Sequence, residues 1–418
     1  MLVLSLLIII ISTLLYFDPL EEETTGFVLE LPGADNVAML PRRFIPIPPM
    51  SALSKLVKKR AAETIVPLMK PSGIVGTGHT FTMLTYNMLS PHYVWPQVYT
   101  YVPDEYKDWK YRHQLLEEEL LMKYRADIMC LQELTWEDYV QYWKPVFGSK
   151  CNYGSKFVAK TPPKYWVKTQ QEMDGEGIFY NMNKFEYMSS TKLFLNDIIG
   201  TFEEDELQYM KTKVVTLTDG AGNHVGQDTL YDILKSRNQV CLFVSLKHKE
   251  TNNVFVVINT HLYWKYDEVK LAQCMIIMRK LSHIINELLI GADPTLSKDV
   301  KILFTGDLNS NRDSLVVKFL KGKIVKHGDL NLINPMKPYL NRCCYDDIPD
   351  DLFVHTCYSG KLKGIFDYVW YHDTDFQLTK MLSGVEVSQE LDTSHQFGLP
   401  NENHPSDHIP LLAEFEIL

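Results

Sequence analysis

The sequence has few cysteines, and they form no recognisable pattern. Seven occur among 418 residues, an odd number, and no two are spaced as C-x-x-C. This usage argues against a zinc ribbon and against a disulfide scaffold. The N-x-S/T glycosylation sequon is also missing. Together these absences favour a reducing, intracellular compartment.

The chain has no excess of positive charge. It carries 42 Lys and Arg against 52 Asp and Glu, a formal net charge of −10, and 45% of its residues are hydrophobic. These globular values exclude disorder, collagen-like repeats and coiled coil for most of the chain. A net acidic protein does not hold nucleic acid by bulk charge, so such a partner would be held locally, by basic residues or metal ions.

The N-terminal region lacks a clear targeting signature. The apolar run Leu2–Phe17 is shorter than the roughly 20 residues that span a bilayer, and no Lys or Arg precedes it. It fits a marginal membrane anchor, a signal-like segment or a mis-called start codon. Residues 36–62 have basic but no acidic side chains, as in a mitochondrial transit peptide with Met39 as an alternative start, or a flexible basic linker. We therefore expect residues 1–79 to form an apolar segment plus a flexible or targeting region. The location left open is mitochondrial, cytoplasmic or membrane-associated.

From residue 80 to residue 418 the pattern predicts one folded domain. Apolar residues of the segment Asp267–Leu289 follow the i, i+3, i+4, i+7 spacing of a helix, with Asp267 as its N-cap, and Asp108–Tyr124 predicts a second helix. Strands interspersed with helices to the last residue predict a single layered α/β domain. Eight short apolar runs predict buried strands, at 81–88, 127–131, 177–180, 240–246, 254–260, 301–305, 366–370 and 411–415.

Polar side chains stand where these strands begin or end. A sheet that brings its strand ends to one rim would gather them in one cleft. Each has an ordinary explanation alone, since a strand-end Glu is usually solvated and the Asp of G-D-L-N can simply form a turn. Six strand boundaries in one domain carry such side chains, which favours a functional site. The residues are Asn87, Glu133, Asn259, His261, Asp307, Asn309, Asp367, Asp407 and His408.

The residue types fit the cleavage of a phosphodiester. Oxygen donors from Glu133, with Asn87, Asp307 or Asp407 nearby, suit Mg²⁺, with Mn²⁺ as a substitute, better than zinc. The two histidines could bind or protonate phosphate oxygens. The reaction needs an oriented water, neutralised oxygens and a stabilised leaving group, and this set supplies all three without a covalent nucleophile.

At these residues the sequence resembles the endonuclease/exonuclease/phosphatase superfamily, from Thr82 to Leu418. It resembles in particular the deadenylase-related branch of nocturnin, angel and the carbon-catabolite-repressor-type nucleases, through W-K-Y-R-H-Q-L-L-E-E-E-L at Trp109–Leu120 and E-V-K-L-A-Q at Glu268–Gln273. Within that branch it is similar to the fungal angel-like RNA exonucleases. The superfamily motifs are L-T-Y-N-M-L-S, A-D-I-M-C-L-Q-E, I-N-T-H-L, F-T-G-D-L-N-S, F-D-Y-V and P-S-D-H.

The resemblance implies a four-layer α/β sandwich, in which two mixed sheets are flanked by helices, and Mg²⁺-dependent 3′→5′ hydrolysis of single-stranded RNA, poly(A) included, to nucleoside 5′-monophosphates. It implies a role for each site residue. Glu133 would be the main metal ligand beside Asn87, with Asp407 on the metal side. Asp307 would orient the attacking water, and Asn309 and His261 would contact the phosphate. His408, oriented by Asp367, would aid the leaving group.

The chain departs from the branch at several positions. It has D-G-E-G-I-F-Y where the branch often has D-G-C-A-I-F-Y, which places Glu176 at a strand entrance, and it lacks the proline common after Trp264. Trp264 and Tyr266, with Asn259 on the preceding strand, are candidates for substrate binding, because aromatic faces stack on bases; rim packing is the alternative for the rings. These changes put adenine preference in doubt. No leucine-rich repeat precedes the domain to recruit it to a large complex, and no motif is specific for DNA.

Two further functions and one further segment stay open. The same constellation serves a phosphatase or cyclic-phosphate hydrolase that acts on a nucleotide or an RNA end, and an inactive RNA- or partner-binding relative would keep the fold. A basic, aromatic stretch with Lys160, Lys164 and Lys168 either guides a nucleic-acid backbone or forms a solvated loop.

Overall fold

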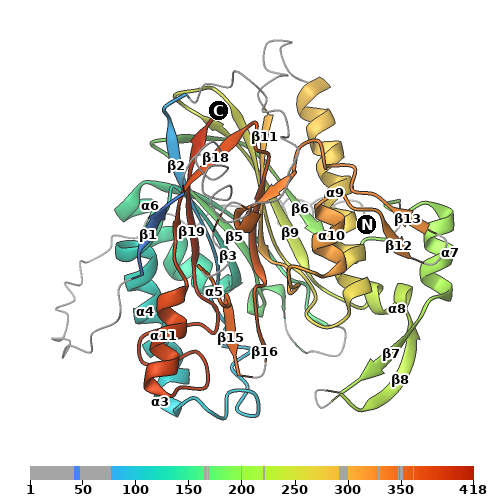
Figure 1. Cartoon of the computed structure of the whole chain (residues 1–418), viewed down its shortest axis with the longest axis horizontal. Coiled ribbons are helices and arrows are strands. Elements are labelled where there is room, and N and C mark those ends of the chain that lie inside the picture. The colour runs from blue at the N-terminus through green and yellow to red at the C-terminus, as the bar shows by residue number, and fades with distance from the viewer. Residues whose placement is uncertain are drawn as a thin grey trace, which may run out of the picture. The chain divides into compact units, whose positions relative to one another are not determined.

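Two mixed β-sheets face each other in the computed structural model of this protein, and helices cover their outer faces (Figure 1). The structure describes residues 42–47, 77–163, 167, 169–198, 200–219, 222–290, 300–327, 330–346, 348, 352–360 and 362–418. All of them belong to one compact unit that spans Leu40–Leu418.

The first sheet has seven strands and the second has six. In spatial order the first consists of β1 (Phe44–Pro46), β18 (Phe376–Leu382), β19 (Leu411–Ile417), β2 (Thr80–Asn87), β3 (Ile128–Thr135), β5 (Asp174–Asn181) and β4 (Tyr153–Ala159). The second consists of β14 (Arg342–Cys343), β17 (Asp367–Tyr371), β11 (Val300–Asp307), β10 (Val254–His261), β9 (Val240–His248) and β6 (Phe185–Phe194).

Each sheet contains one parallel pair of strands, and these two pairs place the polar strand ends. β2 runs parallel to β3, with Asn87 opposite Gln132, and β10 runs parallel to β11, with His261 opposite Asp307. Parallel neighbours end at the same edge of a sheet. β17 runs antiparallel to β11, so Asp367 begins its strand directly opposite Asp307. The topology therefore brings side chains from distant parts of the chain to one rim.

Helices cover the outer faces of both sheets. Along the first lie α4 (Trp109–Glu117), the π-helical turns η1 (Glu118–Lys123) and η2 (Tyr139–Trp143), and α6 (Lys144–Cys151), whose apolar side chains pack on the sheet. Along the second lie α9 (Asp267–Ile290) and α10 (Leu315–Leu320). The remaining helices are α3 (Asp104–Lys107), α5 (Trp136–Asp138), α7 (Glu204–Thr212), α8 (Leu230–Lys235), α11 (Val385–Ser394) and the 3₁₀ turns η3 (Gln170–Glu172) and η4 (Cys344–Asp346).

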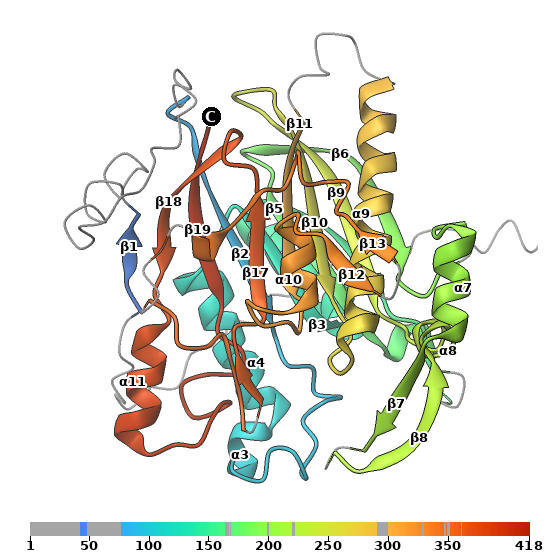
Figure 2. The same ribbon diagram turned by 45° about the vertical axis from the view of Figure 1, so that its right-hand side comes forward.

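Three short hairpins complete the fold. β12 (Val325–His327) pairs with β13 (Leu330–Leu332), and β15 (Cys357–Ser359) pairs with β16 (Leu362–Gly364). β7 (Val214–Thr218) and β8 (His224–Thr229) form an arm that extends away from the sheets at the lower right of Figure 2.

The core lies between the sheets. Phe81 of the first sheet stands 5.2 Å, centroid to centroid, from Phe255 of the second, and its other neighbours are Phe185, Phe376 and Phe415. All five rings are buried. Aromatic side chains of this size contribute a large share of the burial that stabilises a core.

The predicted architecture is confirmed, and the eight predicted strands are present as β2, β3, β5, β9, β10, β11, β17 and β19. The predicted helices correspond to α9 and to α4 with η1. Five strands of the two sheets were missed: β1, β4, β6, β14 and β18. β6 illustrates the reason, because most of its side chains are partly or wholly exposed and it lacks an apolar run.

The structure describes only residues 42–47 and 77–79 of the first 79 residues. β1 lies within the segment expected to be flexible or targeting, and it pairs with β18. The boundary drawn at residue 80 remains a prediction, and Leu2–Phe17 and Met39 lie outside the described residues. Among the described helices, none combines the length and the apolar composition that crossing a membrane requires.

Candidate active site

A β-bulge positions Glu133. Leu131 of β3 pairs with Gly177 of β5 and Leu134 pairs with Gly175, so Gln132 and Glu133 together face one residue, Glu176. The bulge puts Glu133 at φ +56°, in the left-handed region that ordinary residues avoid. Its side chain is buried, and its Oε2 accepts a 2.8 Å hydrogen bond from the backbone N–H of Ser90.

Asn87 links the two sheets at the rim. Its Nδ2 donates to Glu133 Oε1 and to Asp307 Oδ2, both at 3.1 Å, while its Oδ1 accepts from the backbone N–H of Leu89. Asn87 thus holds a carboxylate of each sheet on one amide group. Ser406 donates to the Asn87 carbonyl at 2.6 Å and so ties this strand end to the segment that carries His408.

Asp307 lies at the centre of the cluster. Its Oδ2 is 3.4 Å from His261 Nε2 and 3.5 Å from His408 Nε2. Its Oδ1 accepts from the backbone N–H of Asn309 at 2.8 Å, and the Asn309 amide lies 2.8 Å from His261 Nε2. The turn depends on Gly306, because a Cβ there would lie 1.9 Å from the carbonyl oxygen of Thr260. Asp307 is thus hydrogen-bonded to Asn87 and to the backbone of Asn309, and it lies within 3.5 Å of both site histidines.

His408 and Asp367 form a buried pair, with Nδ1 of the imidazole 2.8 Å from Asp367 Oδ2. Burial opposes protonation of the imidazole, but the Asp367 carboxylate outweighs it and raises the pKa of His408 well above its ordinary value. Burial, assisted by the positive charges of Lys160 and His408, lowers the pKa of His261 well below its ordinary value. The site therefore holds one cationic and one neutral imidazole at neutral pH.

Asp407 stands beside His408 and is fixed by a residue that the sequence analysis did not single out. Tyr99, on the loop after β2, donates its hydroxyl to Asp407 Oδ2 at 2.8 Å. Cys357, Asp407 and His408 bring one potential ligand atom each to within 4.8 Å of one another, as do Asp307, Asp367 and His408.

The donor set fits a hard divalent cation. Burial raises the pKa of Glu133 to about 7, with further contributions from Asp174 and Asp407, and burial also raises the pKa of Asp307. Buried carboxylates that are this costly to ionise would be stabilised by a cation between them, and carboxylate oxygens are the ligands that such ions prefer. Asn87 as placed offers these oxygens its amide hydrogens.

Asn259 differs from the expectation that it contacts substrate. It has no exposed surface, and its Oδ1 accepts from Gln132 at 2.6 Å. Its Nδ2 donates to the carbonyls of Leu131 and Gly177, both at 2.9 Å. Every polar atom of the amide is therefore used to join the second sheet to the first beneath the rim.

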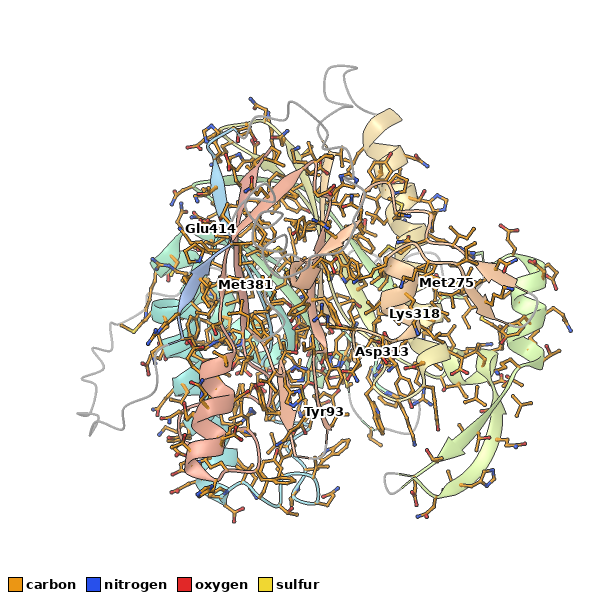
Figure 3. All side chains as sticks on the ribbon, in the orientation of Figure 1. Tyr93, Met275, Asp313, Lys318, Met381 and Glu414 are labelled. Atoms are coloured by element: carbon orange, nitrogen blue, oxygen red, sulfur yellow. The ribbon has the colours of Figure 1, made fainter. Side chains whose placement is uncertain are left out.

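Trp264 and Tyr266 follow β10 but have different surroundings. Trp264 is 55% exposed and lines an open cavity of about 300 Å³ beside Asn309. Tyr266 is partly exposed and accepts, through its hydroxyl, from the backbone N–H of Thr218 at the end of β7, so it anchors the hairpin. The cavity is also lined by Lys270, Asp313, Lys318, Leu362 and Phe366, and Figure 3 labels Asp313 and Lys318.

Lys160 was expected on a basic loop, but it is buried. Its Nζ lies 2.5 Å from Asp174 Oδ2, and the hydroxyl of Tyr93 donates to the other oxygen of that carboxylate. Asp174, at the start of β5, is itself fully buried, so the lysine that pairs with it is buried as well. Lys164 and Lys168 lie outside the described residues.

Glu176 also faces the interior, two residues after Asp174. Its side chain has no exposed surface, and neither of its oxygens has a hydrogen-bond partner in the described part of the chain. Burial raises its pKa well above the ordinary value. Its departure from the branch pattern was visible in the sequence, whereas its burial was not.

Arg112 joins the two loops that carry site residues. It is fully buried on α4 and donates to the carbonyls of Leu89 at 2.5 Å and of Pro405 at 2.8 Å. The first carbonyl lies just after Asn87 and the second just before His408. The motif around Trp109 was recognised from the sequence, but spacing gave no sign of this contact.

Residues 84–408 match the model of the Endonuclease/Exonuclease/phosphatase family. The chain belongs to this family. It is 63% identical to the RNA exonuclease NGL1 of Saccharomyces cerevisiae over 382 residues, which cover 91% of this chain and 100% of that protein. It is 30% identical to Ccr4, the CCR4-Not complex 3′-5′-exoribonuclease subunit of Candida albicans, over 81% of this chain and 41% of that protein. The predicted superfamily and branch are thus confirmed.

Solved structures of the family share the fold. ANGEL2, a 2′,3′-cyclic phosphatase, in complex with adenosine-2′,3′-vanadate, aligns with a TM-score of 0.60 and 21% identity, over 81% of this chain and 96% of that one. The human nocturnin catalytic domain with bound sulfate aligns with a TM-score of 0.52 and 18% identity, over 82% and 97%. These alignments support the two-sheet architecture.

Proposed function

We propose that this chain is a divalent-cation-dependent RNA exonuclease that shortens single-stranded RNA in the 3′→5′ direction and releases nucleoside 5′-monophosphates. The observation that carries the proposal is the convergence on Asp307 Oδ2, which lies within 3.5 Å of Asn87, His261 and His408. The likeness to the yeast RNA exonuclease over that protein's whole length supports RNA as the substrate.

The proposed roles follow from the surroundings of each group. Asp307 orients the attacking water and accepts its proton, which suits a carboxylate whose pKa is raised by burial. His408, kept cationic by Asp367, lies on the other side of Asp307 and offers a proton to the leaving oxygen. Neutral His261 fixes the Asn309 amide, which binds the phosphate.

Glu133, Asn87 and Asp407 are the proposed holders of the cation, which we propose to be Mg²⁺, with Mn²⁺ as a substitute. Asn87, whose Nδ2 faces Glu133 and Asp307 in the structure, would have to turn its amide oxygen toward the ion. When bound, the ion would polarise the phosphate and neutralise its charge. Lys160 is paired with Asp174, and no cationic group lies within hydrogen-bond distance of the Glu133 carboxylate in the described part of the chain.

Trp264 is the proposed base-stacking residue. Its exposed ring and the side chains of Lys270 and Lys318 line the cavity next to Asn309, so a terminal nucleotide with its phosphate at Asn309 could place its base there. The aromatic contact carries no base selectivity of its own. Poly(A) is therefore proposed as one substrate among single-stranded RNAs.

The test offers the purified chain, with Mg²⁺, a 5′-labelled oligoadenylate, a mixed-sequence oligomer of equal length, small phosphomonoesters and an RNA that ends in a 2′,3′-cyclic phosphate. Stepwise shortening with release of 5′-monophosphates supports the proposal, and it should disappear in Glu133→Ala and Asp307→Ala. Release of phosphate from the monoesters, or opening of the cyclic end without shortening, would instead support the phosphatase alternative.

We also propose that residues 1–79 determine where the enzyme resides, as a mitochondrial transit peptide or a membrane anchor. The composition of residues 36–62 supports the first role and the apolar run the second. Fractionation of cells that express a C-terminally tagged chain, with and without residues 1–38, distinguishes mitochondrial, membrane-bound and cytosolic protein.

A further inference from the structure

Three aromatic residues lead outward from the metal side of the site. Tyr99 donates to Asp407, and its ring lies 6.1 Å from the ring of Tyr101. Tyr101 in turn meets Phe397 edge to face, with the ring centroids 5.6 Å apart. Tyr99 is buried, Tyr101 is partly exposed, and Phe397 is 56% exposed. Tyr99, Tyr101 and Phe397 therefore form a row of neighbouring rings from the site to the surface, which we call the aromatic ledge.

The backbone around Phe397 holds the exposed ring in place. Tyr101 donates its hydroxyl to the carbonyl of Leu399 at 2.6 Å, and the N–H of Leu399 donates to the carbonyl of Tyr358 at 3.0 Å. Gly398 lies so close to β15 that a Cβ there would be 2.3 Å from the carbonyl oxygen of Tyr358. A ring fixed in this way can receive a flat ligand at a small cost in side-chain entropy.

A cation accompanies the ring. Lys363 of β16 places its Nζ 5.0 Å from the Phe397 ring centroid, and its side chain is exposed. The preceding residue, Leu362, is 47% exposed and lines the cavity that contains Trp264 and Asn309. The aromatic ledge and the cavity therefore border the same strand, β16.

We propose that Phe397 and Lys363 form a second nucleotide-binding platform, on which a base of single-stranded RNA stacks while Lys363 moves to an adjacent phosphate. This inference rests on the proposed function and extends it from the terminal nucleotide to the chain that precedes it. A net charge of −10 requires the RNA backbone to be held locally, and a lysine beside an exposed ring is the combination that single-strand binders use. The position of Lys363 on the strand that also borders the cavity at Asn309 favours RNA over a protein partner or a second copy of the chain.

The experiment compares Phe397→Ala, Lys363→Ala and Phe397→Trp with the unmodified chain. The matched control is the double variant Lys156→Ala, Tyr187→Ala, because Lys156 Nζ lies 4.0 Å from the exposed Tyr187 ring on edge strands β4 and β6. Steady-state cleavage of oligoribonucleotides from dinucleotide to decamer gives KM and kcat. Fluorescence anisotropy gives binding of the decamer to each variant in a Glu133→Gln background with Mg²⁺.

Loss of one stacked base corresponds to roughly a 5- to 100-fold change in affinity. We expect Phe397→Ala to raise the decamer KM and Kd within that range with kcat unchanged. Lys363→Ala should weaken decamer binding less and should reduce the salt dependence of binding. Phe397→Trp should bind the decamer as the unmodified chain does. The control should match the unmodified chain. An unchanged decamer Kd in Phe397→Ala would overturn the platform, as would an equal fall in kcat on every substrate. An unmodified chain that binds but never shortens RNA would instead overturn the proposed function, while the anisotropy comparison still decides the platform.

Discussion

His408 Nδ1 lies 2.8 Å from Asp367 Oδ2, and this buried contact decides which of the two site histidines carries a charge. Asp367→Asn should lower the pKa of His408, because the carboxylate that offsets burial of the imidazole is removed. We expect kcat to fall roughly 10²- to 10⁴-fold at pH 8, with the alkaline limb of the rate–pH profile displaced to lower pH. A rate–pH profile for the shortening of the 5′-labelled oligoadenylate checks this.

Asp373→Asn is the control for that experiment, since Asp373 is an exposed carboxylate paired with Asn341 at the other end of β17. Its profile should match that of the unmodified chain. An alkaline limb that stays in place in Asp367→Asn would mean that His408 does not act as the acid.

Glu133→Gln should stabilise the metal-free protein and abolish its response to Mg²⁺. Burial raises the pKa of Glu133 from 4.5 to about 7. A protein that buries such a carboxyl loses stability as pH rises from 4.5 to 7, because the unfolded chain ionises the group first. The free energy of unfolding of the variant should therefore exceed that of the unmodified chain. The difference should grow between pH 4.5 and pH 7 to about 3 kcal/mol and then stay constant. Thermal unfolding across pH, with and without Mg²⁺, measures both effects.

Mg²⁺ at 100 times its Kd should raise the stability of the unmodified chain by about 2.7 kcal/mol. The same addition should leave Glu133→Gln nearly unchanged and its kcat near background. A variant that Mg²⁺ stabilises as much as the unmodified chain would remove Glu133 from the metal site.

Arg112→Lys should impair catalysis more than substrate binding. The guanidinium holds the Leu89 and Pro405 carbonyls together, and a lysine ammonium cannot reproduce that fork. For Arg112→Lys we expect kcat to fall about tenfold with KM little changed. Arg112→Ala should lower the free energy of unfolding by about 3 kcal/mol, because the buried carbonyls lose their donor. Lys110→Ala on the exposed face of the same helix is the control, and a pure KM effect in Arg112→Lys would contradict the positioning role.

The site was largely predictable from the sequence because its residues terminate strands that are themselves apolar. Once β2, β3, β10 and β11 are recognised, the parallel pairing of each sheet leaves Asn87, Glu133, His261 and Asp307 at one rim. Asn259 shows the limit of this argument. It lies two residues before His261, yet its side chain points between the sheets and is consumed by contacts with Gln132 and backbone carbonyls, which are set by pairing across sheets.

Tertiary contacts account for the other residues that sequence reasoning missed. Tyr99 and Lys160 lie in segments whose local pattern indicates loops. Their positions depend on where Asp407 and Asp174 fall in three dimensions. Helix and strand periodicity carries no information on such pairings.

Glu176→Gln provides the contrast that separates a catalytic carboxyl from a merely buried one. Burial raises the pKa of Glu176 well above 4.5, so the stability gained by the variant should begin to grow at about pH 4.5. The gain should grow as pH rises through the raised pKa of Glu176, in the same direction as that of Glu133→Gln. Neither oxygen of Glu176 has a partner in the described part of the chain, so an isosteric amide removes no hydrogen bond that the structure shows. We therefore expect kcat to stay close to that of the unmodified chain, because Glu176 makes no hydrogen bond to a proposed reacting group. Thermal unfolding at closely spaced pH values gives the two curves. A gain that is constant above pH 5, or a loss of kcat as large as that of Glu133→Gln, would show that Glu176 is ionised in the folded protein and acts in the site.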